Sequence, residues 1–260
     1  MTRKNIRIIM TLNGRERGLR MHPMMFFAVL AAYFVKGLAG FANSLVFGSI
    51  MNFFTTNLNI VPVDLLLGTP SNLILSIHSR REIRWKTALI LAAFMTVGTL
   101  PGVFLLKNGD DRMLKIVLGI LILCLGVEML TRDRRKAPRE RKRWVTWALA
   151  ALAGMLMGTF GIGAVMVVCV ERLTDNPRAM RGTLCTVFLA DNVIRTIMYA
   201  ATGVLTAEVA LTALKLLPMM ILGLLGGMTL AGRLPDKTVR RIIIVMLMLT
   251  GASLALTNLL

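Results

Sequence analysis

The sequence is poor in the residue types that most enzymes use for chemistry. It has 2 histidines and 3 cysteines, and Cys124, Cys169 and Cys185 lie inside apolar runs without the spacing of a metal site or a disulfide framework. It contains no HExxH, GxSxG or Walker-type sequence. These absences argue against an enzyme, a metal site and a cofactor. An ATP-driven mechanism would need a partner subunit.

Acidic residues are also scarce. The chain has 13 Asp and Glu against 31 Lys and Arg, which gives a formal net charge of +18. In a soluble protein this excess would suggest a nucleic-acid partner, but no basic and aromatic pattern of a nucleic-acid fold is present. The basic residues crowd short segments between apolar runs, as they do in the cytoplasmic loops of membrane proteins. We therefore expect a lipid bilayer and no nucleic acid.

Apolar sequence, in contrast, is abundant: 56% of the residues are hydrophobic and the mean hydropathy is +0.70. A helix needs about 20 apolar residues to cross a bilayer. The sequence predicts an all-α polytopic membrane protein of about eight transmembrane helices. The predicted spans are roughly 24–54, 60–78, 87–106, 113–130, 144–170, 182–201, 208–232 and 240–259.

The first and fifth of these spans are interrupted at their centres. Residues 36–43 read KGLAGFAN, and residues 158–163 form an echo, GTFGIG. Small residues that interrupt matching spans of two halves indicate a transporter site built from broken helices. The alternative is that the glycines only allow tight helix packing. The glycines expected to shape the breaks are Gly37, Gly40, Gly158 and Gly161.

The two halves of the chain match in order, which predicts two related four-helix repeats with broken first helices. The offset is 121 for the glycine pairs, 120 for Asn72 and Asn192, and 125 for Gly98 and Gly102 with Gly223 and Gly227. The predicted domains are a basic cytoplasmic tail (1–23), a first transmembrane repeat (24–130), a basic cytoplasmic linker (131–143) and a second transmembrane repeat (144–260).

Orientation follows from the basic residues. With eight crossings, the tail, the 80–86 loop and the linker share one side with 18 basic residues. The other side has ten, in the loops 107–115, 172–181 and 233–241. The positive-inside rule then predicts a cytoplasmic N-terminus. The second half alone prefers the reverse, a conflict that an inverted repeat with a re-entrant element could produce.

Few charges lie within the predicted spans, which makes each one a candidate for function. Asp191 and Arg195 are four residues apart on one helix and can pair, either as part of a site or only to make each charge tolerable. Lys36 is central in its span, whereas Lys215 can snorkel to the interface. Asp64 falls in the first turn of the second predicted helix, where the helix dipole accounts for it. Three buried cations, Lys36, Arg195 and Lys215, against one buried acid, Asp191, predict an anionic substrate.

Amide side chains complete the predicted site. Asn43, Asn72 and Asn192 can donate N–H groups to the oxygens of an anion, or they can only bond across helix interfaces. The segment 68–72, GTPSN, predicts irregular backbone that lines a cavity at membrane depth. The predicted substrate-binding residues are Lys36, Gly37, Gly40, Asn43, Asn72, Gly158, Gly161, Asn192 and Arg195.

Over about residues 24–258 the chain resembles the sulfite exporter TauE/SafE family of membrane permeases. The segments that carry the resemblance are GLAGFANSLVFGS, its echo GMLMGTFGIGAVMVV, GTPSNLILSIHSRREIRWKTALIL, TVGTLPGVFLL and LLGGMTLAGRLPD. The resemblance implies a secondary transporter of two four-helix repeats in the bacterial inner membrane. It also implies export of small anions such as sulfite, sulfoacetate or other organosulfur acids. Phe41-Ala-Asn43 stands where the family usually has a run of glycines, a departure that bears on the substrate.

The predicted function is therefore secondary transport of a small organic or sulfur-containing anion, coupled to a proton or another ion. The alternative is a non-transporting membrane scaffold or a subunit of a larger complex, with the basic linker as its docking segment. Flux that disappears only when a partner is deleted would favour that alternative. The sequence leaves the oligomeric state open.

Overall fold

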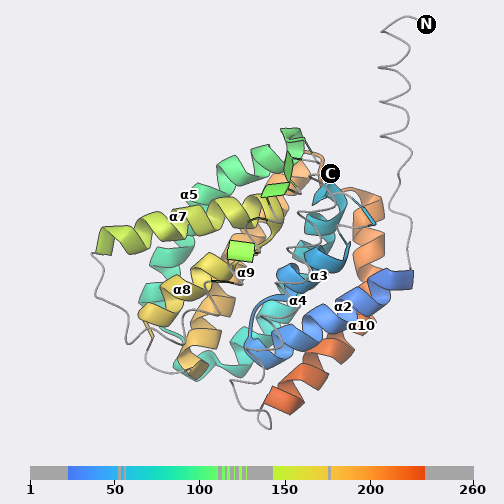
Figure 1. Cartoon of the computed structure of the whole chain (residues 1–260). Coiled ribbons are helices and arrows are strands. Elements are labelled where there is room, and N and C mark those ends of the chain that lie inside the picture. Colours follow the sequence, from blue (N-terminus) through green and yellow to red (C-terminus); the bar gives the residue numbers. More distant parts are fainter. Residues whose placement is uncertain are drawn as a thin grey trace, which may run out of the picture.

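The computed structural model describes residues 23–110 and 143–231, apart from 52, 53, 56, 175 and 176, together with isolated positions between 113 and 127. This part of the chain is helical and contains no strand (Figure 1). The predicted tail, most of the fourth span, nearly all of the linker and the last span lie outside the described residues.

Four of the described helices, α4, α5, α9 and α10, are long and apolar enough to cross a membrane. Their outer faces carry exposed apolar side chains such as Leu89, Ile197 and Leu214, as expected of surfaces that meet lipid. The predicted all-α class is therefore confirmed. In chain order the elements are α2 (Pro23–Ala39), α3 (Asn43–Met51), α4 (Asn57–His78), the 3-10 turn η1 (Arg80–Glu82), α5 (Trp85–Asn108), α7 (Arg143–Phe160), α8 (Ala164–Arg172), α9 (Pro177–Ala201) and α10 (Ala207–Ala231).

Both glycine-containing spans are interrupted by short turns. Between α2 and α3, Gly40 has a φ of +86° and Ala42 a φ of +76°. Glycine adopts this left-handed region without strain, whereas alanine does so at some cost. Between α7 and α8, Gly161 has a φ of +72°. The first break begins at Gly40, so Gly37 lies within α2.

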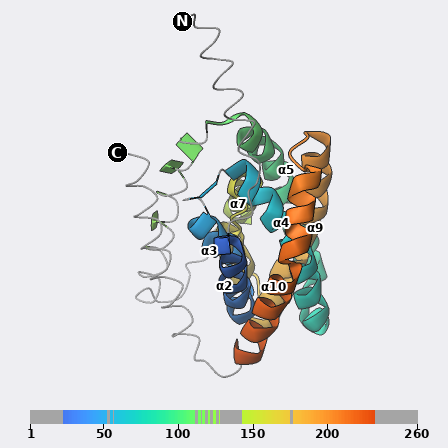
Figure 2. The same ribbon diagram turned by 90° about the vertical axis from the view of Figure 1, so that its right-hand side faces the viewer.

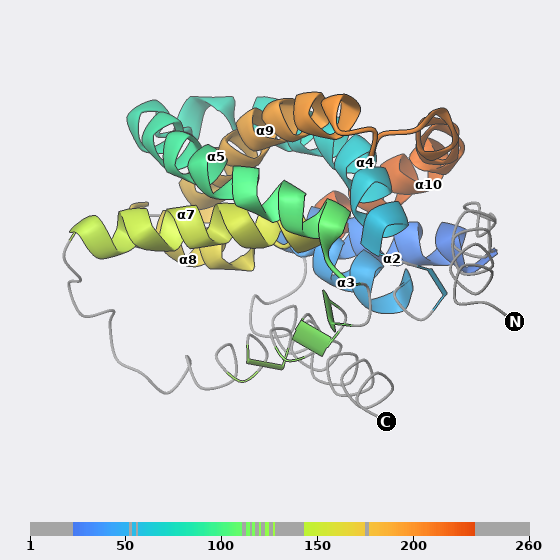
Figure 3. The ribbon, with the colours of Figure 1, turned by 90° about the horizontal axis from the view of Figure 1, so that it is seen from above.

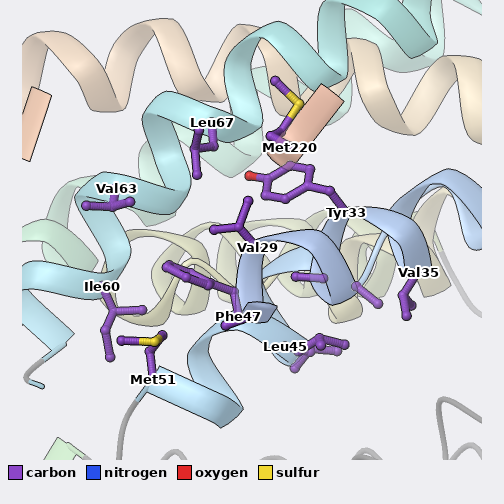
Figure 4. Close-up of a cluster of buried hydrophobic side chains, with 14 of the residues drawn as sticks. Val29, Tyr33, Val35, Leu45, Phe47, Met51, Ile60, Val63, Leu67 and Met220 are labelled. Atoms are coloured by element: carbon purple, nitrogen blue, oxygen red, sulfur yellow. The ribbon is translucent and has the colours of Figure 1, made fainter. Parts of the chain in front are cut away.

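The half-helices double back instead of continuing across. In Figure 4, the labelled side chains of residues 29–35 follow α2 in one direction and those of residues 45–51 follow α3 in the opposite direction. In the second pair, Cys169 Sγ lies 3.9 Å from the carbonyl oxygen of Thr146, although one straight helix would hold these residues roughly 35 Å apart. The interpretation of each segment as one broken crossing is therefore wrong. α2–α3 and α7–α8 are helical hairpins, as in re-entrant elements.

The hairpin α7–α8 also changes which loops share an end of the helix bundle. The backbone N–H of Arg84 donates to Thr183 Oγ1 at 3.1 Å, and Arg84 Nη1 donates to the carbonyl oxygen of Leu173 at 3.1 Å. The scheme of eight crossings placed segments 80–86 and 172–181 on opposite sides of the membrane. That assignment is wrong, because the two segments are in contact.

Each hairpin packs against a long helix through a seam of glycines. α7 lies along α5 (Figure 3), and α2 lies along α10 (Figure 2). A Cβ atom on Gly102 would lie 3.0 Å from Gly158 Cα, and one on Gly227 would lie 2.9 Å from Gly37 Cα. Backbones can approach this closely only where side chains are absent. Gly37 and Gly158 therefore lie in helix contacts, as the packing alternative expected.

α4 and α9 cross each other between these two pairs, because α9 also packs against α5 and α4 also packs against α10. α4 runs through Pro62 and Pro70 without interruption, so the prediction of irregular backbone at 68–72 is wrong. Polar side chains in this segment bond to carbonyl groups of their own helix: Ser71 Oγ donates to Gly68 O at 2.8 Å. Such bonds help a transmembrane helix to tolerate proline.

Candidate functional site

The tips of both hairpins meet at a small cavity beside the α4–α9 crossing. Its volume is about 20 Å³ for the centres of water molecules, room for one or two of them. Six of the nine predicted substrate-binding residues line it, and Gly37, Gly40 and Gly158 do not. The six are Lys36, Asn43, Asn72, Gly161, Asn192 and Arg195.

Asp64 also lines the cavity, and the interpretation from the sequence misplaced it. α4 begins seven residues earlier, so Asp64 lies beyond the first turn and is only 5% exposed. Its carboxylate accepts hydrogen bonds from Tyr33 Oη at 2.9 Å, from Asn43 Nδ2 at 2.9 and 3.1 Å, and from Ser44 Oγ. The explanation by the helix dipole is wrong. The rule that singled out Lys36, a charge inside an apolar span, applies equally to this acid.

Tyr33 was not predicted, because an aromatic residue in an apolar span gives no functional signal. Its ring is fully buried and lies near Val29, Leu67 and Met220 (Figure 4). This packing holds the hydroxyl against α4, where it donates to Asp64 Oδ1. Hydrogen bonds to Asp64 therefore connect both α2 and α3 to α4.

Asp191 and Arg195 form a buried ion pair, with 3.3 Å between Arg195 Nε and Asp191 Oδ2. Thr99 Oγ1 donates to Asp191 Oδ1 at 2.7 Å. Arg195 Nη1 donates to the carbonyl oxygen of Met157 and Nη2 to Asn192 Oδ1, both at 2.7 Å. Asp191 does not line the cavity. The guanidinium of Arg195 thus lines the cavity, and its charge is compensated by Asp191, which lies outside the lining.

Lys36 differs from Arg195 in having no direct counter-charge. Its side chain is 1% exposed, and Nζ lies 5.6 Å from the centre of the Tyr33 ring, a cation–π distance. Across the described ranges, no hydrogen bond or ion pair reaches Nζ, and Asp64 acts on it only over a longer distance. A buried cation that lines a cavity without a paired carboxylate is suited to bind an anion.

The two asparagines at matching positions are engaged differently. Asn192 accepts from Arg195, and its Nδ2 donates to Thr69 Oγ1 at 3.2 Å, so both ends of its amide are hydrogen-bonded. Asn72 is 2% exposed, and its Oδ1 has no partner among the described residues. Of the two, Asn72 is the one whose amide oxygen, a hydrogen-bond acceptor, lacks a partner in the described structure.

The balance of buried charge differs from the expectation. Lys215 is exposed and Asp64 is buried, so the count of three buried cations against one acid is wrong. Within the described ranges, Lys36 and Arg195 face two buried acids, Asp64 and Asp191, and the four charges sum to zero. The cavity lining alone carries two cations and one acid.

Comparison with known proteins decides the family. The family model described as Sulfite exporter TauE/SafE matches residues 25–254. The chain belongs to the TauE/SafE family. Since the family consists of permeases, this TauE/SafE protein is a membrane transporter and not an enzyme. In the part of the chain that can be described, no group of three His, Cys, Asp or Glu side chains is placed to hold a metal ion.

Two known proteins are similar to this TauE/SafE protein over most of its length. "Probable inner membrane transporter protein TsaS" of Comamonas testosteroni is 27% identical over 192 residues, which cover 73% of this chain and 80% of that protein. "Probable sulfite/organosulfonate exporter TauE" of Cupriavidus necator is 26% identical over 180 residues, 68% of this chain and 70% of that protein. No solved structure matches the chain.

Proposed function

We propose that this TauE/SafE protein is a secondary transporter that exports a small sulfite or organosulfonate anion across the bacterial inner membrane. The observation that carries the proposal is the cavity at the start of α3, which is lined by Lys36, a buried cation without a hydrogen bond or ion pair among the described residues. The amide of Asn72 also lines this cavity. A lysine ammonium has three donors and an amide two, and the first N–H groups of a helix attract anions. The oxygens of a sulfonate or sulfite group match these donors. The name of the Cupriavidus relative supports this substrate class.

The proposal also includes two related repeats that pack against each other. The contact of Gly102 with Gly158 corresponds to that of Gly227 with Gly37 at the offsets found in the sequence, 125 and 121. In each contact, the long helix of one half supports the hairpin of the other half. A cavity with room for one or two waters is too small for a sulfonate, so the tips must separate to admit it. Movement of the two hairpin–helix pairs about the α4–α9 crossing would open the site to alternate sides.

We also propose an orientation. The bundle end that contains the 79–84 loop and residues 173–183 would face the cytoplasm, because basic side chains gather there and Lys107 lies near the opposite end. Since α2 runs antiparallel to α3, and α3 leads to the start of α4, Pro23 would then lie on the outer side. Pro23, the first described residue, would therefore lie on the side opposite to the one expected for the end of the basic tail. The basic residues at the cytoplasmic end are Arg80, Arg81, Arg84, Lys86 and Arg181.

The test is flux of methanesulfonate and of sulfite into proteoliposomes that contain the purified full chain. Lys36→Met keeps the length of the side chain but removes its charge, and we expect flux to fall by about tenfold to a hundredfold, the worth of a hydrogen bond to a charged group. Lys215→Met is the matched control, because Lys215 is exposed on α10, and it should stay within about twofold of the parent protein. Asn72→Ala provides a second variant of the lining.

Equal flux in Lys36→Met and Lys215→Met would remove the cavity from the transport path. A parent protein that transports neither anion would overturn the proposed function. If flux appeared only after a partner protein was added to the vesicles, the scaffold alternative would be favoured instead.

A further inference from the structure

The carboxylate of Asp64 occupies donors that a substrate anion would need. Asn43 and Ser44 are the first two residues of α3, both line the cavity, and both donate to Asp64. Hydrogen bonds of this kind, from neutral donors to a carboxylate, are roughly twice as strong as bonds between neutral groups. Asp64 thus stands in the position of an internal anion at the hairpin tip. A substrate cannot take the same hydrogen bonds until the carboxylate releases them.

The balance of the buried charges also singles out Asp64. With Lys36, Arg195, Asp64 and Asp191 all ionised, the buried charge sums to zero. A monovalent anion in the cavity would make it negative, and uncompensated charge in a site that excludes water is costly. Asp191 is held by Arg195 and Thr99 and lies outside the lining. Asp64 is therefore the acid that can neutralise the added charge by taking up a proton.

We propose that Asp64 is the proton-binding group of this transporter and that the substrate anion binds when Asp64 is protonated. The inference rests on the proposed function of anion transport. The proton bonds to one carboxylate oxygen, comes from the aqueous side to which the cavity is open, and returns to water on the side where the anion leaves. No other bond changes. Once protonated, Asp64 accepts only weaker hydrogen bonds, so Asn43 and Ser44 can turn to the anion, and proton and anion move in the same direction.

Ionisable groups around Asp64 come from two helices. Lys36 and Arg195 are the two cations that line the cavity together with Asp64. α3 contributes no ionisable side chain, and on α10 Glu208 and Lys215 are exposed. The groups that interact with Asp64 or share its cavity are Tyr33 and Lys36 on α2, and Arg195 and Tyr199 on α9.

The experiment is calorimetric titration of the purified full chain in detergent with methanesulfonate, whose charge is the same at acidic and neutral pH. Buffers with different ionisation enthalpies report how many protons are taken up per anion. We expect close to one proton per anion, with the Kd rising by about tenfold for each pH unit above the range in which Asp64 titrates. Asp64→Asn, which mimics the neutral acid, should bind with no proton uptake and no dependence on pH.

Two tyrosines give a matched pair of variants that keeps the acid in place. Tyr33→Phe removes one hydrogen bond from the carboxylate, so the pH at which affinity starts to fall should move upward by about one unit. Tyr199→Phe removes an equally buried hydroxyl that donates to Gly158 O at 2.9 Å, and it should not move that pH.

The outcomes separate this inference from the function on which it rests. Binding by the parent chain without proton uptake, unchanged pH dependence in Asp64→Asn, or equal shifts in the two tyrosine variants would overturn the role of Asp64 while leaving an anion transporter. Absence of both binding and flux in the parent chain would overturn the function and the inference together.

Discussion

Adjacent glycines on α10 provide a quantitative test of the packing of the hairpin α2–α3. A Cβ atom on Gly226 would lie 3.5 Å from the Phe34 ring, an ordinary contact. A Cβ atom on Gly227 would lie 2.9 Å from Gly37 Cα and closer still to the carbonyl oxygen of Phe34. Because these neighbours are backbone atoms, Gly227→Ala must push α2 and α10 apart by roughly an ångström, whereas Gly226→Ala need not.

Apart from this clash with the backbone of α2, the two substitutions have the same effect. Each replaces glycine by alanine in the same helix, which favours the helix by about 1 kcal/mol. The overpacking of Gly227→Ala costs about 1–3 kcal/mol. We therefore expect Gly226→Ala to be at least as stable as the parent chain, and Gly227→Ala to be less stable than Gly226→Ala by about 1–3 kcal/mol.

The assay is unfolding of the purified protein in mixed micelles with increasing dodecyl sulfate, followed by circular dichroism. The free energy of unfolding of the two variants is compared directly, so the shared gain in helix propensity cancels. Equal stability of Gly226→Ala and Gly227→Ala would refute the close approach of α2 and α10.

Two further predictions concern the buried pair and the loops. Thr99→Val removes the hydroxyl that donates to Asp191 and should lower the free energy of unfolding by about 1.5–3 kcal/mol. Thr96→Val loses only a hydrogen bond within its own helix and should change the free energy of unfolding by about 0.5 kcal/mol or less, so similar losses in both variants would contradict the bond from Thr99 to Asp191. In a cysteine-free background, Arg81→Cys and Thr174→Cys should react with an impermeant maleimide from the same side of the membrane, and labelling from opposite sides would exclude the contact between their loops.

Much of the candidate site was predictable, because the bilayer makes polar residues conspicuous. A charge or an amide within an apolar run is costly, so Lys36, Asn43, Asn72 and Arg195 can be picked out of their predicted spans by residue type alone. All four line the cavity. Asp64 obeys the same rule and was missed only because the predicted start of its helix lay too close to it. An error of three residues in a helix boundary placed this buried acid in the first turn of its helix, where the helix dipole was a sufficient explanation.

The sequence by itself determined that this protein is a helical membrane transporter with two interrupted segments, since the length of apolar runs and the places where they are interrupted are local properties. Tertiary structure alone decided that each interrupted segment turns back, because a break of three residues does not specify the angle between its flanking helices. It also decided which charges are buried: Lys215 faces outward and Asp64 inward. Burial depends on which face of a helix meets its neighbours, and that is settled only when all of the helices pack together.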